Sequence, residues 1–222
     1  MFNVAIDGPA GAGKSSIAKA AARSLGFIYV DTGALYRAVA LAVIRNGIDV
    51  DDERAVEELL ESIDVSLDFR DGTQSVILNG EDVSEEIRLP EVSAAASTVS
   101  AIPAVRTFLF NLQRHIAENS DCLMDGRDIG TVVLPNADLK VFLTASPEER
   151  AKRRYEELME KGNDVDYEQV LSDINKRDYQ DTHRKVSPLK AADDAVLLDT
   201  TSLSFDEVTD ELISLVKERM AK

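Results

Sequence analysis

Residues 8–15 carry the pattern G-x-x-x-x-G-K-[ST], which predicts a loop that binds phosphate groups. The glycines allow backbone N–H groups to surround phosphate oxygens, and Lys14 can reach the β and γ phosphates of a nucleotide. A neighbouring hydroxyl can serve Mg²⁺; Ser15 is the expected residue, and Ser16 is an alternative. The residues expected to hold ATP are Gly8, Pro9, Ala10, Gly11, Ala12, Gly13, Lys14, Ser15 and Ser16.

A cluster of arginines follows a strong helix-start signal at Ser146–Glu149. An N-cap serine, a proline at the first helical position and a glutamate three residues after the serine are typical of a capping box. Arg150, Arg153 and Arg154 follow at i, i+3 and i+4, so they lie on one face of the predicted helix. A guanidinium group can bind two phosphate oxygens at once, and this face could therefore neutralise the charge of a phosphoryl group.

A second arginine-bearing face precedes Pro188. Arg177, Asp181 and Arg184 are spaced i, i+4 and i+7, which again places them on one side of a helix. The alternative for both helices is a solvated surface of paired charges. Because a phosphate loop is present, we favour a helical hairpin near 147–185 that closes as a lid over ATP.

Two other nucleotide-binding classes agree less well with the sequence. Residues 175–178 read N-K-x-D, the guanine-recognition motif of GTPase switches, but the preceding segment 167–174 is predicted to be a helix rather than a strand. The D-x-x-G signature of those switches is missing, and the glycines do not form the dinucleotide pattern G-x-G-x-x-G. A kinase is therefore favoured over a switch or a non-enzymatic binding module.

The elements that must position these residues alternate between strand and helix, which is typical of an α/β fold with a parallel sheet. Val4–Ile6 leads into the glycine loop, and the alanine-rich stretch Ser15–Leu25 follows as a helix. Other predicted strands are Phe27–Val30, Cys122–Met124, Leu139–Leu143 and Ala195–Leu198. Their C-terminal ends should line the site, because ligands of such sheets bind there.

A small antiparallel insert is predicted within the first half of the chain. Val65–Phe69 and Ser75–Leu78 flank the segment Arg70–Thr73, whose central Asp-Gly pair is a hairpin signal. Asn79–Gly80 offers a second turn. These short strands predict a hairpin set apart from the parallel sheet.

Composition limits the partners that the protein can have. The 222 residues carry a net charge of -16 with a pI near 4.5, which argues against a nucleic-acid or anionic-membrane partner. The single cysteine, Cys122, cannot form an internal disulfide, and no apolar run reaches the roughly 18 to 20 residues of a membrane-spanning helix. We therefore expect a cytoplasmic protein.

Two further segments identify a protein family more specifically than the phosphate loop, which many families share. Asp31–Arg37 carries D-[ST]-G-x-x-Y-R and Asp125–Thr131 carries D-G-R-D-x-G-T, each after a predicted strand. With Ala94–Ser97, Pro103–Arg106 and Lys176–Arg184, they resemble bacterial-type cytidylate kinases over essentially the whole chain. The resemblance implies a P-loop nucleoside monophosphate kinase of pyrimidine metabolism that transfers the γ-phosphoryl group of Mg·ATP to CMP or dCMP.

The resemblance also implies a role for each matching residue. The residues implied to bind CMP are Thr32, Arg37, Ser97, Arg106, Arg127, Asp128, Arg177 and Asp181. The residues implied to act on the phosphoryl group in transfer are Lys14, Arg127, Arg153, Arg154 and Arg184. The family often has G-K-G-T where this chain has Lys14–Ser16, so the choice of the serine for Mg²⁺ stays open.

The implied cytosine recognition agrees with hydrogen-bond chemistry. A carboxylate such as Asp128 can accept from the N4 amino group of cytosine while Arg106 donates to N3 or O2. Uracil exchanges donor and acceptor at both positions and would leave buried groups unsatisfied at about 1 to 3 kcal/mol each. The site can therefore select cytosine over uracil.

The sequence-based prediction is a three-layer α/β fold over a single domain, residues 1–222. A substrate-binding insert is expected near 62–100 and an arginine-bearing lid near 147–185. We expect a monomer whose partners are ATP and CMP or dCMP, with Mg²⁺ as cofactor and no nucleic acid or membrane. The alternative is another small-molecule P-loop kinase, acting on a different monophosphate or on a non-nucleotide acid.

Overall fold

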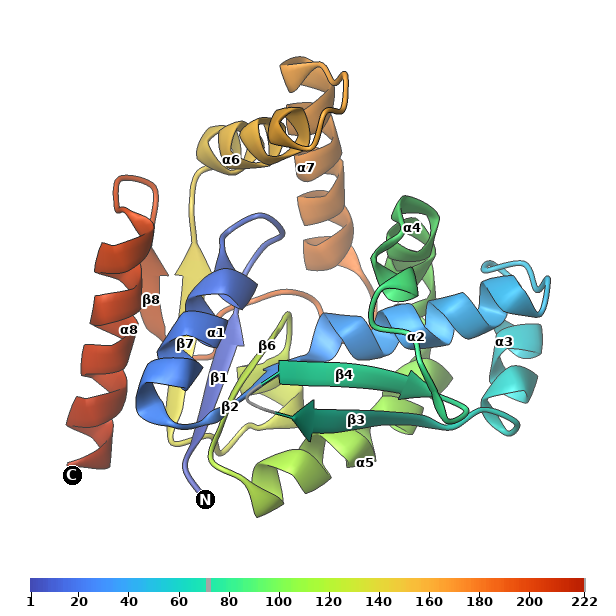
Figure 1. Ribbon diagram of the computed structural model, residues 1–222, viewed down its shortest axis with the longest axis horizontal. Coiled ribbons are helices and arrows are strands. Elements are labelled where there is room, and N and C mark those ends of the chain that lie inside the picture. Colours follow the sequence, from blue (N-terminus) through green and yellow to red (C-terminus); the bar gives the residue numbers. More distant parts are fainter. Residues whose placement is uncertain (71–72, 222) are drawn as a thin grey trace. The chain divides into compact units, whose positions relative to one another are not determined.

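The computed structural model describes residues 1–70 and 73–221. The chain divides into two compact units, the first made of Met1 and Phe27–Cys122 and the second of Phe2–Gly26 and Leu123–Lys222. Figure 1 labels most of the helices and strands of both units. The interpretation as a single domain with a lid and an insert stays a prediction.

The larger sheet is parallel where its register is defined, and it has five strands in the order β2-β6-β1-β7-β8. Val4 of β1 pairs with Leu139 of β7, and Val141 of β7 pairs with Val196 of β8. The strands are β1 (Asn3–Asp7), β2 (Ile28–Asp31), β6 (Cys122–Gly126), β7 (Leu139–Thr144) and β8 (Val196–Asp199). All five lie where strands were predicted, and the α/β fold with a parallel sheet is confirmed.

The second unit places a helix after β1 and another at the C-terminus of the chain. Helices α1 (Lys14–Leu25) and α8 (Phe205–Met220) pack against each other. The alanine-rich sequence of α1 buries Ala18, Ala21 and Ala22, since small side chains permit close helix packing. Helix α8 begins with the capping box formed by Ser204 and Glu207.

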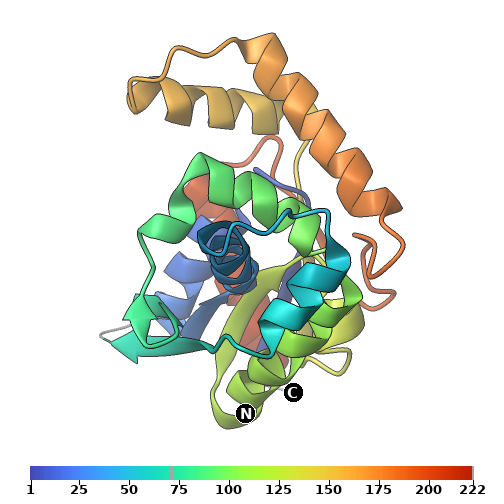
Figure 2. The ribbon, with the colours of Figure 1, turned by 90° about the vertical axis from the view of Figure 1, so that its right-hand side faces the viewer.

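A helical hairpin follows β7. Helix α6 (Pro147–Glu160) begins where the sequence predicts, because Ser146 accepts a hydrogen bond from the backbone N–H of Glu149. Helix α7 (Tyr167–His183) packs against it, and the two share a small core of Ala151, Val170 and Ile174. Figure 2 shows the two helices joined by a loop.

The first unit joins helices to a small antiparallel sheet around a core of its own. Its sheet has the order β3-β4-β5, in which Val65 pairs with Leu78 and Leu78 pairs with Glu81. The elements after β2 are α2 (Thr32–Arg45), α3 (Glu53–Leu60), β3 (Val65–Arg70), β4 (Thr73–Leu78), β5 (Glu81–Asp82), η1 (Glu86–Arg88), α4 (Pro90–Val99) and α5 (Pro103–Asn119). The core includes Leu35, Val39 and Leu109, all fully buried.

The predicted antiparallel insert is confirmed in its strands and in one turn. Asn79 and Gly80 have φ angles of 50° and 83°, as required of a tight turn between β4 and β5. The other predicted turn, at Asp71–Gly72, lies outside the described residues. The sequence analysis missed α3, although Asp52 is its N-cap and accepts from the backbone N–H of Ala55.

Over residues 1–70 and 73–221, no single helix combines enough length and hydropathy to cross a bilayer. Helices α4 and α5 satisfy the criterion only as a pair, by length and composition, with a bend of 101° between them.

Candidate active site

The phosphate loop joins β1 to α1 through three glycines with positive φ. Gly8, Gly11 and Gly13 have φ angles of 151°, 75° and 85°, values that side-chain-bearing residues rarely adopt. A Cβ atom on Gly8 would also lie 1.9 Å from the carbonyl oxygen of Leu143 in β7. The glycine spacing of the motif is therefore required by this turn itself, before any ligand is considered.

Lys14 is the first residue of α1 and is buried within the second unit. Its Nζ donates to the carbonyl oxygen of Pro9 at 2.8 Å, across the loop. Burial, with the Arg127 guanidinium as the next largest cause, lowers the pKa of Lys14 to about 7, although Asp125 and Asp7 oppose the shift. A phosphate group bound beside Lys14 would stabilise its charged form.

A hydroxyl and a carboxylate meet at the start of α1. The Ser15 hydroxyl donates to Oδ2 of Asp125 at 2.7 Å, and Asp125 is buried at the end of β6. Both groups supply the oxygen ligands that Mg²⁺ prefers. The sequence analysis assigned no role to Asp125, although a carboxylate directly after a buried strand was a usable signal.

The segment that follows Asp125 turns sharply and carries two predicted site residues. Arg127 donates through Nε to Oδ2 of Asp181 at 2.8 Å, which joins the segment to α7. Asp128 is buried and its Oδ1 lies 3.7 Å from Nη2 of Arg184. The structure thus brings together Arg127, Asp128, Asp181 and Arg184 in the second unit.

The last residue of β1, Asp7, contacts the same segment. Its Oδ1 and Oδ2 accept hydrogen bonds from the backbone N–H groups of Ile129 and Gly130, both at 2.7 Å. Burial raises the pKa of Asp7 to about 6, although the two backbone N–H groups oppose the shift. The sequence analysis missed this residue, because its partners are 122 and 123 positions away.

The three arginines on the predicted face of α6 have different surroundings. Arg150 is buried; it donates to the Ala10 carbonyl of the phosphate loop at 3.0 Å and pairs with both carboxylate oxygens of Asp178 at 3.1 and 2.5 Å. Arg153 donates to Glu149 and to Thr200. Arg154 is exposed and pairs with Glu157 on its own helix.

Helix α7 supplies the other arginine-bearing face. Arg177 is an exposed residue whose charge lowers the pKa of Lys14. Asp181 is buried and holds Arg127, while Arg184 caps the helix and donates through Nε to the Ser187 carbonyl. Of the predicted lid residues, Arg184 lies beside the Arg127–Asp128 segment, whereas Arg153 and Arg154 contact other groups.

The remaining predicted residues lie in the first unit. Asp31 caps α2 by accepting from the backbone N–H of Ala34, and its carboxylate pairs with Arg37 at 2.8 Å. Thr32, the first residue of α2, is buried. The D-T-G-x-x-Y-R segment is therefore a capped helix start that fixes the Arg37 guanidinium against Asp31.

Helices α4 and α5 carry the other two. Arg106, on α5, is buried, donates to the Ser100 carbonyl at 3.1 Å, and has its guanidinium carbon 5.5 Å from the centre of the Tyr36 ring. Ser97 lies on α4, and its carbonyl accepts from the Ser100 hydroxyl. Tyr36 is thus a further residue of the D-T-G-x-x-Y-R segment that contacts a predicted cytosine-binding side chain.

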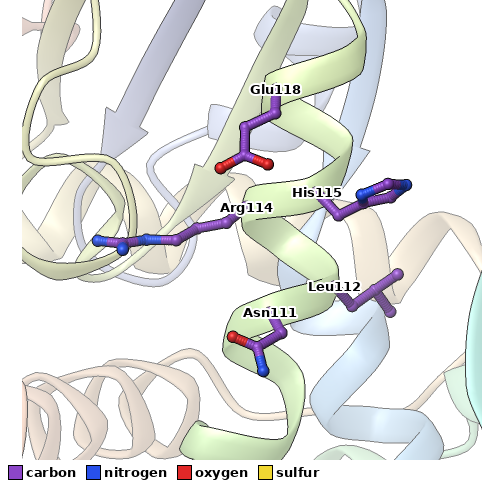
Figure 3. Close-up of a pocket in the computed structure, with 5 residues that line it drawn as sticks. All are labelled: Asn111, Leu112, Arg114, His115 and Glu118. Atoms are coloured by element: carbon purple, nitrogen blue, oxygen red, sulfur yellow. The ribbon is translucent and has the colours of Figure 1, made fainter.

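A surface pocket elsewhere in the first unit involves none of these residues. Figure 3 shows its lining on α5, formed by Asn111, Leu112, Arg114, His115 and Glu118. Over residues 1–70 and 73–221, there is also no group of three or more His, Cys, Asp or Glu that could hold a metal ion alone. The phosphate loop and the Asp125–Asp128 segment remain the candidate active site.

A parallel sheet whose first strand leads through a lysine-bearing glycine loop into a helix defines the class of P-loop nucleotide-binding proteins. Within that class, the family model described as "Cytidylate kinase" matches residues 4–218. The chain belongs to the cytidylate kinase family.

Individual relatives agree with the family match. The cytidylate kinase of Caldicellulosiruptor bescii is 54% identical over 214 residues, covering 96% of this chain and 95% of that protein. The cytidylate kinase of Caldanaerobacter subterraneus subsp. tengcongensis is 54% identical over 215 residues, covering 97% and 94%. A crystal structure of an uncharacterized protein from Eubacterium ventriosum has a TM-score of 0.52 at 14% identity, covering 98% and 99%, a likeness of fold alone.

Proposed function

We propose that the protein is a nucleoside monophosphate kinase that transfers the γ-phosphoryl group of ATP to CMP or dCMP, giving ADP and CDP or dCDP. The observation that carries this proposal is the arrangement around Lys14. In one unit, the lysine of the phosphate loop lies within electrostatic reach of Asp125 and Arg127, and the buried Asp128 follows directly. Membership of the cytidylate kinase family supports the choice of acceptor.

The donor side is assigned to the phosphate loop. Backbone N–H groups of residues 10–13 would surround the β and γ phosphates, and the N-terminus of α1 adds a favourable dipole. Lys14 would exchange its hydrogen bond to the Pro9 carbonyl for phosphate oxygens. Because burial lowers the pKa of Lys14, the lysine gains stabilisation of its charge when anionic phosphates arrive.

The residues at the start of α1 fit Mg²⁺. Ser15 and Asp125 present a hydroxyl and a carboxylate at one point, and a magnesium ion held largely by ATP phosphates and water needs few protein ligands. These two residues would hold the ion, and Ser15 is preferred because its hydroxyl contacts Asp125. When bound, Mg²⁺ neutralises charge on the β and γ phosphates.

The acceptor side is assigned to two arginines that are each paired with a carboxylate. Arg37 and Arg127 would bind the 5′-phosphate of CMP, and each is now oriented by a carboxylate, from Asp31 and Asp181 respectively. Thr32, at the start of the same helix as Arg37, would line this acceptor site. Arg177 and Asp181 would bind the ribose hydroxyls.

Cytosine would be recognised by Ser97, Arg106 and Asp128. An ionised Asp128 can only accept, so it complements the N4 amino group of cytosine and opposes O4 of uracil. Arg106, held against Tyr36 and Ser100, can donate to N3 or O2. Ser97 would add a hydroxyl contact from α4.

Transfer needs positioning and charge neutralisation rather than a covalent intermediate. An oxygen of the CMP phosphate attacks the γ-phosphorus in line, and ADP leaves on the opposite side. Lys14, Arg127 and Arg184 would stabilise the charge on the transferring group. Arg153 and Arg154 would join them after closure of the α6–α7 hairpin, giving up their present contacts with Thr200 and Glu157. We propose that the enzyme acts as a monomer in the cytoplasm.

One assay of ADP release tests the proposal and ranks the acceptors. ATP is supplied with CMP, dCMP, UMP, AMP, GMP or shikimate, and ADP is detected by a coupled reaction. We expect CMP and dCMP to give the highest kcat/KM, with UMP at least ~10-fold lower, because uracil opposes Asp128. Comparable turnover of AMP, GMP or shikimate would contradict the assigned acceptor, and no acceptor-dependent ADP at all would contradict the kinase itself.

A further inference from the structure

We infer that Asp7 is a positioning residue for the acceptor, which holds the Arg127–Asp128 segment in place by capping the turn that follows it. The inference rests on the proposed function, because it assigns Asp7 to CMP rather than to ATP. Asp7 is buried at the end of β1 and directly precedes the phosphate loop in sequence. Its chain position and its electrostatic effect on Lys14 suggest a role toward ATP, but its hydrogen bonds are with the turn that follows Asp128.

The contacts of Asp7 are with the turn η2 (Ile129–Val133), a single π-helical turn. Both carboxylate oxygens accept, one from the N–H of Ile129 and one from the N–H of Gly130, each at 2.7 Å. These are the first two N–H groups of the turn, which have no acceptor within it. Asp7, which lies on β1, therefore caps the N-terminal end of this turn.

Asp128 occupies the N-cap position of this turn but does not cap it. An aspartate at that position ordinarily accepts from the next N–H groups of its own helix. Here the Asp128 side chain makes no capping hydrogen bond, and its carboxylate lies 3.7 Å from Arg184 instead. Because Asp7 satisfies the turn, the Asp128 carboxylate can be directed to another partner, which is what cytosine recognition requires.

The turn is also packed closely against Asp7. A Cβ atom added to Gly130 would lie 3.3 Å from Oδ2 of Asp7 and 3.2 Å from Cδ of Lys140. Lys140 is itself buried and pairs with Asp194 at 2.8 Å. With a carboxylate on one side and a lysine on the other, the turn has little room to shift, so its position depends on the length and charge of residue 7.

Substitution Asp7→Asn tests the inference with almost no change in shape. The amide keeps one acceptor but turns an NH₂ group toward a backbone N–H, so one of the two hydrogen bonds is lost. We expect kcat/KM for CMP to fall by at least ~10-fold, with KM for CMP raised and KM for ATP changed by less than ~3-fold. The ratio of kcat/KM for CMP over UMP should fall as well.

Asp138→Asn is the matched control. The Asp138 carboxylate accepts from the N–H of Asn3, so it binds the opposite end of the same strand and is exposed. We expect this variant to keep wild-type kinetics for both nucleotides. If Asp7→Asn instead raises KM for ATP and leaves the CMP/UMP ratio unchanged, Asp7 acts through the phosphate loop and the inference is wrong.

A second variant changes the turn instead of Asp7, and it tests the same contact if Asp7→Asn does not fold. Gly130→Ala keeps the Asp7 carboxylate but pushes the turn away from it, so the same selective rise in KM for CMP is expected in milder form. A folded Gly130→Ala protein with unchanged KM for CMP and unchanged CMP/UMP ratio would overturn the inference.

Amide hydrogen exchange separates this inference from the proposed function. In the wild-type protein the Ile129 and Gly130 amides should be protected, and Asp7→Asn or Gly130→Ala should raise their exchange rates at least ~10-fold while Asp138→Asn does not. This readout needs no acceptor. Wild-type protein that fails to phosphorylate CMP would contradict the proposed function, whereas unprotected wild-type amides would contradict the anchoring of the turn.

Discussion

The phosphate loop and the α6–α7 hairpin both carry basic side chains, but they hold them in different ways. Lys14 is buried and its Nζ donates to the Pro9 carbonyl of its own loop, with Asp7 and Asp125 within electrostatic reach. On the hairpin, Arg150 has a side chain 3% exposed, whereas that of Arg154 is 48% exposed. Helical spacing places the arginines on one face, but only those that are buried contribute substantially to the stability of the fold.

The largest effect expected from this comparison is at Lys14. Lys14→Ala should lower kcat by at least ~10²-fold, the usual scale for one electrostatic group acting on a transition state. Steady-state ADP release with CMP measures it, and circular dichroism checks folding. Lys19→Ala, an exposed lysine on the same helix, is the control and should keep wild-type turnover. Near wild-type kcat in folded Lys14→Ala protein would remove the loop from the mechanism.

The next effect contrasts two arginines of α6 in their contribution to stability. Arg150→Met removes the partner of Asp178 and of the Ala10 carbonyl, and should lower the free energy of unfolding by about 2 to 4 kcal/mol. Arg154→Met removes only an exposed ion pair with Glu157, and should change the free energy of unfolding by less than about 0.5 kcal/mol. Urea unfolding followed by circular dichroism compares them, and equal losses would contradict the structural role assigned to Arg150.

A smaller effect is expected at Asp128 on the choice of base. Asp128→Asn keeps the shape but adds an NH₂ group that can donate to O4 of uracil. The ratio of kcat/KM for CMP over UMP should fall by at least ~10-fold, equivalent to about 1.4 kcal/mol. Parallel kinetics with both acceptors measure the ratio. If both activities fall by the same factor, Asp128 serves phosphate positioning or folding rather than base recognition.

The smallest effect concerns the two hairpin arginines that contact groups other than the phosphate loop. Replacing Arg153 and Arg154 with Gln should lower kcat by roughly 5-fold and leave CMP binding without ATP nearly unchanged, because these residues act after closure. Arg54→Gln, which removes an exposed pair with Glu58 on α3, is the control. Unchanged kcat in the folded double variant would return both residues to the solvated-surface alternative.

The same comparison explains how much could be predicted from the sequence. The phosphate loop was predictable because its geometry is local: the glycines, the lysine and the helix start lie within eight consecutive residues. The strands and the start of α6 were predictable for the same reason, through buried apolar runs and the Ser146 cap. The different surroundings of Arg150, Arg153 and Arg154 could not be predicted. Helical spacing predicts that they share a face, but it does not predict which of their side chains tertiary packing buries.

Contacts between distant segments were also beyond the sequence. Ser15 and Asp125 are 110 residues apart, and Asp7 is 122 residues from Ile129, so no local pattern joins them. Cytosine recognition was inferred from resemblance and hydrogen-bond chemistry, and the roles of Ser97, Arg106 and Asp128 stay predictions. The structure adds that Asp128 occupies the N-cap position of its helical turn and yet does not cap it with its side chain.

The central claim is that the phosphate loop transfers a phosphoryl group from ATP to a cytidine monophosphate. The most direct test follows the label from [γ-³²P]ATP incubated with CMP and the wild-type protein, with Lys14→Ala in parallel. Our account predicts that the label appears in the β-phosphate of CDP with the wild-type protein, and at least ~10²-fold more slowly with Lys14→Ala. Release of the label as inorganic phosphate, or equal transfer by both proteins, would contradict it.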